Sequence, residues 1–132
     1  MHEDQRRRRA RAVLALTAFV FACIGGAFLL DTRGIAQQVD IRLDSSRAVV
    51  ELATFYGGLS LGIAGALFVC SRHVAWLEPG LFVGVAMLAG AALVRAGAMI
   101  ATGTADGLLM ALLLAELCGA AINVWALRTL RR

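Results

Sequence analysis

The chain has 132 residues, 60% of them apolar, and a mean hydropathy of +0.77. This is too apolar for a soluble domain of that size, so the composition indicates a membrane protein. The formal charge of +4 comes from arginines, since the sequence contains no lysine, and most of them fall in Arg6–Arg11 and Arg128–Arg132. Arginines beside an apolar run fix topology and contact anionic lipid, so we expect membrane lipid as a partner and no nucleic acid.

Cys23, Cys70 and Cys118 all lie inside apolar runs and show no paired Cys/His spacing. We therefore predict no disulfide framework, no metal site and no cofactor. Nothing in the sequence resembles a hydrolase triad, a zinc helix, a P-loop or a dinucleotide fingerprint. An enzyme is the less favoured interpretation, because a lone Glu with a lone Arg lacks a nucleophile or a metal.

The first apolar run follows a basic segment. We expect residues 1–11 to form a short, flexible cytoplasmic tail. Residues 12–30 carry no charge and are long enough to cross a bilayer core of about 30 Å. A signal peptide is the competing interpretation, since Gly25-Gly26-Ala27 resembles a cleavage site. The run exceeds the usual apolar region of about 7–15 residues, so we predict a first transmembrane helix.

Residues 31–47 form the largest polar stretch, which we interpret as an external connector. Residues 39–44 alternate apolar and charged side chains, as strands do, whereas Ile35, Val39 and Leu43 fit one stripe of a helix. The pattern leaves both conformations open. Ser45 or Ser46 is suited to cap the next helix.

The second span is predicted at 48–71. Five of its residues fall at helical spacing on one face, which should meet another helix because small residues let backbones approach closely in lipid. Packing inside the chain is the first expectation for this GxxxG-containing face, and dimerisation is the alternative. The five residues are Glu51, Phe55, Gly58, Gly62 and Gly65.

The third and fourth spans are predicted at 80–102 and 107–127. Pro79 is suited to the first position of the third helix. Gly103–Asp106 should turn the chain tightly, with Asp106 as the N-cap of the fourth helix.

Orientation follows from the arginines. With the N-terminus inside, the inner segments carry nine arginines and the outer connector carries three, so both termini are predicted to be cytoplasmic. This indicates a multi-pass protein of a bacterial inner membrane. The inner arginines are Arg6, Arg7, Arg8, Arg9, Arg11, Arg72, Arg128, Arg131 and Arg132, and the outer ones are Arg33, Arg42 and Arg47.

Two opposite charges lie deep in the last two spans. Counting from the outer ends at about 1.5 Å per residue, Arg95 lies about 10 Å deep, Glu116 about 13 Å and Glu51 about 5 Å. Both charges of the last two spans lie on small-residue faces, which point into a bundle. Arg95 shares its face with Gly84, Ala91, Ala98 and Thr102, and Glu116 shares its face with Gly119, Ala120 and Asn123.

Two interpretations of this polar interior stay open. Arg95 and Glu116 form a structural ion pair that fixes which helix faces which, or they form a ligand or proton site, together with Glu51 and Asn123. Glu51 has the simpler alternative of pairing with Arg47 on its own helix, and Asn123 of donating a hydrogen bond between helices.

The spacing of Glu51, Gly57-Gly58 and Gly62, followed by Leu93-Val94-Arg95 and Leu114-Ala115-Glu116-Leu117, resembles a bacterial four-helix membrane family catalogued as domain of unknown function 4345. The resemblance covers roughly residues 47–132, and DoxX-like four-helix proteins are a near alternative. It implies four spanning helices with acidic, arginine and acidic positions at Glu51, Arg95 and Glu116, and no established activity.

We therefore predict an all-α integral membrane four-helix bundle that forms one domain over residues 1–132. The first functional hypothesis is a non-enzymatic protein whose intramembrane pocket, built by Arg95 and Glu116, binds a small molecule or a lipid head group. The second is an accessory subunit that docks on a membrane-protein partner or on another copy of itself. A docking subunit should expose a glycine stripe, whereas a binder should enclose its polar face in a cavity.

Overall fold

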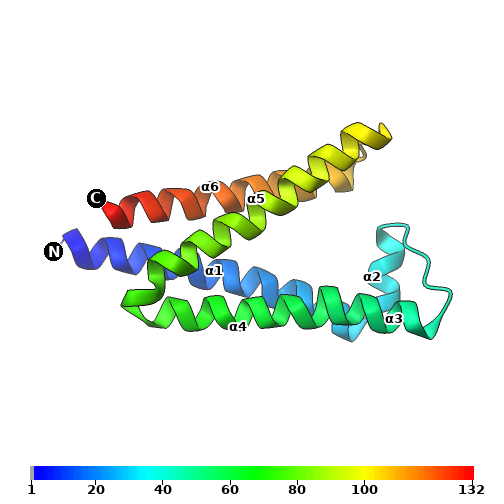
Figure 1. Cartoon of the computed structure of the whole chain (residues 1–132), viewed down its shortest axis with the longest axis horizontal. Coiled ribbons are helices and arrows are strands. Elements are labelled where there is room, and N and C mark those ends of the chain that lie inside the picture. Colours follow the sequence, from blue (N-terminus) through cyan, green and yellow to red (C-terminus); the bar gives the residue numbers. More distant parts are fainter. Residues whose placement is uncertain (1) are drawn as a thin grey trace. The chain divides into compact units, whose positions relative to one another are not determined.

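The computed structural model describes residues 2–132, and this part of the chain is all-α, with no strand. Figure 1 labels the α-helices of the chain, and two short helical segments, η1 and η2, lie between some of them. The elements in chain order are α1 (His2–Leu30), α2 (Thr32–Gln38), α3 (Ser46–Leu52), the π-helical η1 (Ala53–Gly58), α4 (Leu59–Arg72), the 3-10 helix η2 (Val74–Trp76), α5 (Leu77–Thr102) and α6 (Gly107–Arg131).

Four helical stretches within residues 2–132 are long and apolar enough to cross a membrane. They run over Glu3–Leu30, Ser46–Arg72, Val74–Thr102 and Gly107–Arg131, and each contains one of the four predicted spans. The all-α class is thereby confirmed, and the four candidate spans indicate a multi-pass membrane protein. The side of the membrane on which the termini lie stays a prediction.

The basic N-terminal segment is helical, so the predicted flexible tail is wrong. Residues 2–11 form the first turns of α1 without a break before the apolar run. Glu3 and Asp4 lie in the first turn, where negative charge is favourable to the helix dipole. Arg7 donates to Glu3 at 2.5 Å across one turn, an arrangement that supports an exposed helix.

The polar connector begins with a short helix, which ends before the alternating residues 39–44 whose pattern left helix and strand open. Asp31 caps α2 by accepting a hydrogen bond from the Gly34 amide at 2.9 Å. The helix ends in a Schellman motif, with the Ile41 amide donating to the Ala36 carbonyl at 2.9 Å and Asp40 in the left-handed region at φ 56°. Residues 41–44 that follow adopt neither helix nor strand.

The second span starts at its predicted cap but is not a uniform α-helix. Ser45 accepts a hydrogen bond from the Ala48 amide at 3.1 Å at the start of α3. The π-helical segment Ala53–Gly58 then interrupts the α-helical pattern. One extra residue in a turn rotates the following side chains by roughly 100° relative to a continuous α-helix. The 3.6-residue period of an α-helix therefore cannot be extended from α3 across this π-helical segment into α4.

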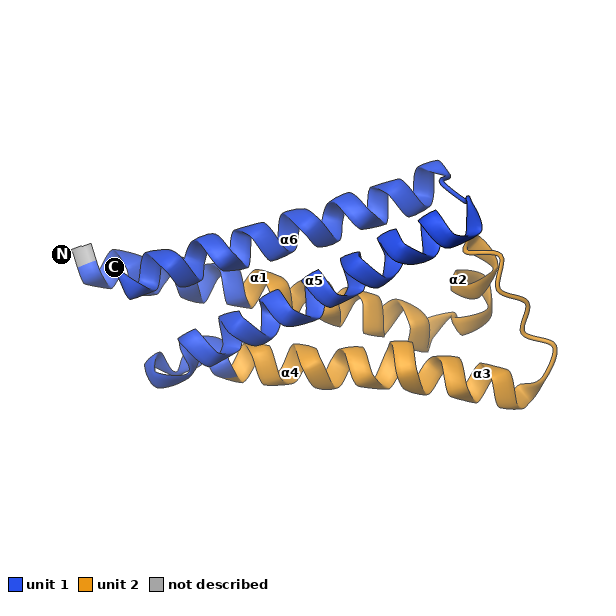
Figure 2. Ribbon diagram, turned by 45° about the horizontal axis from the view of Figure 1, so that its top comes forward, with its two compact units in different colours: residues 1–14, 70–132 blue, residues 15–69 orange. Residues whose placement is uncertain are grey.

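The chain divides into two compact units, which are coloured separately in Figure 2. Unit 1 comprises the described part of Met1–Leu14 together with Cys70–Arg132, and unit 2 comprises Ala15–Val69. Helices α1 and α4 each run from one unit into the other.

In unit 2, α1 packs on the second span through two glycines. A Cβ on Gly25 would lie 2.8 Å from the Gly57 carbonyl oxygen and 2.8 Å from Leu61 Cγ. A Cβ on Gly57 would lie 2.6 Å from Leu29 Cδ2. At Gly25 only glycine allows this approach, because a side chain there would displace backbone atoms of the second span, whereas at Gly57 it would displace the side chain of Leu29. The Phe28 and Tyr56 rings stack beside the contact, with centroids 4.9 Å apart.

In unit 1, α5 and α6 form an antiparallel hairpin. Gly103 ends α5 at φ 67°, and Asp106 caps α6 by accepting a hydrogen bond from the Leu109 amide at 2.8 Å, as predicted. Pro79 is the third residue of α5 rather than the first. It is tolerated there because amides of the first helical turn have no partner within the helix.

Candidate functional site

Arg95 of α5 and Glu116 of α6 form a bidentate ion pair inside the hairpin. Arg95 Nη2 donates to Glu116 Oε1 at 2.6 Å, and Arg95 Nε lies 3.1 Å from Oε1 and 3.0 Å from Oε2. The two side chains are 27% and 14% exposed, respectively. The predicted pairing is confirmed, and its planar geometry is the one that guanidinium and carboxylate groups favour.

The lengths of the two helices bring these groups to one level. Arg95 lies seven residues before the end of α5, and Glu116 lies nine residues after the start of α6. At about 1.5 Å per residue these offsets correspond to about 10 and 13 Å from the connecting turn. The tight turn joins two antiparallel helices, so residues at similar offsets face each other.

Small residues hold the two helices close together. A Cβ on Gly119 of α6 would lie 2.9 Å from Leu88 Cδ1 of α5. Gly84 of α5 packs against Asn123 of α6 in the same way, since a Cβ added to Gly84 would lie 2.7 Å from Oδ1 of the Asn123 side chain. The buried Ala120 completes the predicted small-residue face of α6.

The predicted face of α5 is partly wrong. Ala91, Ala98 and Thr102 are exposed, whereas Ala92 is buried. The buried residues of α5 include Gly84, which was predicted on this face, together with Leu81 and Ala92. Arg95 follows Ala92 by three positions, so it lies on the same side of the helix and contacts Glu116 from there.

Asn123 lies buried at the α5–α6 interface. Its Nδ2 donates to the carbonyl of Gly119, one turn earlier in α6, at 2.9 Å. The side chain therefore fits against Gly84 while it is also held by its own helix. Its contacts are those of an interface residue, and its predicted share in a ligand site stays a prediction.

Glu51 lies exposed on α3 in unit 2. The predicted local pair with Arg47 is not formed, and Glu51 has no ion pair within residues 2–132. Its predicted share in the polar site likewise stays a prediction.

Gly58, Gly62 and Gly65 lie on an exposed face of the second span. A Cβ added to any of them would meet nothing within 4 Å. Gly57 lies one position away and makes the contact with α1 instead. The predicted packing of these three glycines therefore does not concern α1.

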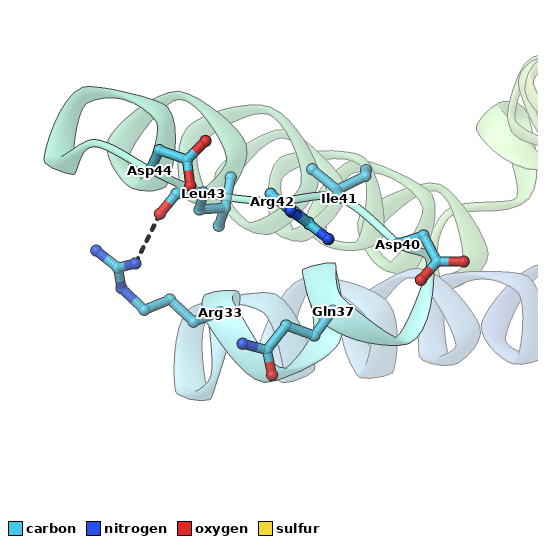
Figure 3. A pocket seen from close by; sticks show the side chains of 7 residues that line it. All are labelled: Arg33, Gln37, Asp40, Ile41, Arg42, Leu43 and Asp44. Atoms are coloured by element: carbon cyan, nitrogen blue, oxygen red, sulfur yellow. Dashed lines mark hydrogen bonds between the residues drawn. The ribbon is translucent and has the colours of Figure 1, made fainter.

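Three of the surface pockets formed by the described residues are lined by none of the predicted site residues Arg95, Glu116, Glu51 and Asn123. The pocket in the connector measures about 360 Å³ and is shown in Figure 3. Arg33 closes one side of it by donating to the Leu43 carbonyl at 2.8 Å. No group of three or more His, Cys, Asp or Glu side chains within residues 2–132 could hold a metal ion.

Sequence reasoning missed the glycines that make the closest helix contact in unit 2. The sequence pattern assigns Gly25 to a possible cleavage site, and it predicts that Gly58, rather than the neighbouring Gly57, packs against another helix. The adjacent pairs Gly25-Gly26 and Gly57-Gly58 were the available signal. They could not show which member of each pair meets the neighbouring helix.

Comparison with known proteins gives the family of this chain but no activity. No curated protein and no solved structure shows significant similarity to the chain. A family model described as a domain of unknown function (DUF4345) matches residues 9–127, which include α5 and most of α6 with the Arg95–Glu116 pair. The chain belongs to this family of unknown function, as its resemblance in sequence predicted.

Proposed function

We propose that the protein is a non-enzymatic membrane subunit that associates with a second copy of itself through the exposed Gly58–Gly62–Gly65 face. The observation that carries the proposal is the open space over these three glycines. Without a strong hydrophobic force between helices in lipid, close backbone approach at small residues is a main source of association. The open face is the feature expected of a docking subunit.

A second copy is the simplest occupant of that face. Between Glu51 and Arg72 the second span carries no charge, so no electrostatic feature selects a different partner. Exposed apolar side chains, among them Phe55, Leu59 and Phe68, flank the glycines. A patch of this kind is self-complementary under two-fold symmetry, which is the commonest symmetry of oligomers.

In this proposal the Arg95–Glu116 pair has a structural role. Each charge is already matched by the other, and the contact fixes the rotation of α5 against α6. A lone charge at the centre of a span costs roughly 2.5–3.5 kcal/mol, so the pair also removes a penalty from each helix.

Oligomeric state in native-lipid nanodiscs tests the proposal. We expect two copies per disc for the unchanged protein and mostly one for Gly62→Leu, whose added side chain separates the helices. Gly97→Leu is the matched control, because Gly97 is also an exposed helical glycine with nothing within 4 Å. A dimer that survives Gly62→Leu, or a different protein in the disc at equal stoichiometry, would refute the second copy as occupant.

Ligand binding at Arg95 is the second candidate, favoured by the exposure that both side chains retain. A ligand carboxylate or phosphate would have to compete with Glu116 for the guanidinium. Native mass spectrometry of protein extracted with its own lipids should then show a bound molecule that Arg95→Lys releases and Arg131→Lys retains. Identical spectra for both variants would rule this candidate out.

We propose further that the protein lies in a bacterial inner membrane with both termini in the cytoplasm. The support is the ratio of nine inner to three outer arginines. Within unit 1, the start of α1 and the end of α6 also lie at the same end (Figures 1 and 2). Reporter fusions at residue 132 and in the 31–47 connector should report the cytoplasm and the outside, respectively, and the opposite result at either position contradicts the topology.

A further inference from the structure

A surface groove runs along the last three turns of α6. It measures about 430 Å³ and its lining residues recur every three or four positions, as one face of a helix requires. Because Asn123 and Ala126 are buried on the other side of α6, this face points away from α5. The lining residues are Ala121, Val124, Trp125, Arg128, Thr129 and Arg132.

The groove changes from apolar to cationic along the helix axis. Ala121 and Val124 line the half that lies farther into the span, and Arg128 and Arg132 line the half at the helix end. The 12 residues from Ala121 to Arg132 extend over about 16 Å along the axis. Trp125 lies between the two halves and its side chain is 49% exposed. Aromatic side chains are usually found at this position, where a membrane span meets water.

Arg128 and Arg132 are available to an external anion. Arg131, the third arginine at this helix end, donates to Glu78 of α5 at 2.6 and 2.9 Å. Within residues 2–132, Arg128 and Arg132 form no ion pair. The partial charge of about −0.5 at a helix C-terminus opposes an anion, but two guanidinium charges outweigh it.

The hydroxyl of Thr129 does not compete for this role. It donates to the Trp125 carbonyl at 2.8 Å, so its hydrogen is engaged within the helix. Hydrogen bonds to a phosphate would therefore come from the two arginines. Residues four apart lie on one side of a helix with Cβ atoms about 6 Å apart, a spacing that two guanidinium groups can close on one phosphate.

We propose that this groove binds one anionic phospholipid of the phosphatidylglycerol class, with its phosphate between Arg128 and Arg132 and an acyl chain along Val124 and Ala121. The apolar half of the groove favours a lipid over a soluble phosphate, which would leave that half unused.

Native mass spectrometry in a neutral detergent tests the site. The purified full chain is mixed with equal amounts of dioleoyl-phosphatidylglycerol and dioleoyl-phosphatidylcholine. We expect selective retention of one phosphatidylglycerol, weakened about 10-fold or more in the double variant Arg128→Gln/Arg132→Gln, since each arginine near an anionic lipid contributes about 5-fold. Arg131→Gln is compared with the single variants Arg128→Gln and Arg132→Gln as their matched control, because it removes one arginine charge at the same helix end but outside this groove.

A second readout locates the lipid at the groove. In a Trp76→Phe background Trp125 is the only tryptophan. Brominated phosphatidylglycerol should quench the fluorescence of Trp125 more than brominated phosphatidylcholine does. In the double variant Arg128→Gln/Arg132→Gln the two lipids should quench it equally. Equal loss of lipid in the Arg131 control would show an effect of net charge only. Competition by glycerol phosphate at equal concentration would show a soluble anion site. Either result overturns the proposal.

Discussion

The energetic coupling between Arg95 and Glu116 can be predicted from their geometry. Two donor nitrogens meet both carboxylate oxygens between 2.6 and 3.1 Å, at a partly buried position. Arg95→Ala strands the carboxylate and Glu116→Gln strands the guanidinium. Loss of one partner of a buried pair costs about 3–5 kcal/mol, and the amide oxygen that remains in Glu116→Gln should place that variant at the lower end.

The double variant should cost less than the sum of the two single variants. With both charges removed, neither group is left desolvated without its partner. We expect a coupling free energy of about 1.5–3 kcal/mol, measured by equilibrium unfolding of all four proteins in mixed micelles.

The same two helices provide a matched control pair. Arg131 and Glu78 are also an Arg–Glu pair between α6 and α5, but their side chains are 59% and 49% exposed. An exposed pair of this kind contributes about 0–1 kcal/mol, so its cycle should show little coupling. If the Arg95 cycle is additive within about 0.5 kcal/mol, or no larger than the control, the structural role of the pair is refuted.

Three further predictions concern helix contacts and caps, and each is measured as a free energy of unfolding in the same micelles. Gly84→Ala should cost about 1–3 kcal/mol, because its Cβ would lie 2.7 Å from Asn123 Oδ1. Gly90→Ala, in open space on the same helix, should be neutral or stabilise by about 0.5–1 kcal/mol, and equal effects would contradict the α5–α6 crossing. Gly25→Ala should destabilise the protein by about 1–3 kcal/mol, because a Cβ at this position meets the backbone of the second span, whereas the adjacent Gly26→Ala should not. A larger loss for Gly26→Ala than for Gly25→Ala would show that the opposite face of α1 contacts the second span. Asp106→Ala should cost about 1 kcal/mol by removing the cap of α6, and Asp106→Asn, which keeps an acceptor oxygen, should restore most of it.

The sequence alone was sufficient for features that depend on neighbouring residues. The four spans follow from the length of uninterrupted apolar runs, and a bilayer imposes that length directly. The caps at Ser45 and Asp106 follow from side chains that accept a hydrogen bond two or three residues ahead. The Arg95–Glu116 pair was predictable because a tight turn between two helices fixes their relative register.

Only the tertiary structure decided which side of each helix makes contact. One residue along a helix is a rotation of about 100°, so a prediction that is off by one position selects a different face. This separates Ala92 from Ala91 on α5 and Gly57 from Gly58 in the second span. The π-helical turn at Ala53–Gly58 and the approach of Gly25 to Gly57 depend on how two helices fit together. That fit is a property of the packed backbones, which apolar periodicity along one chain does not encode.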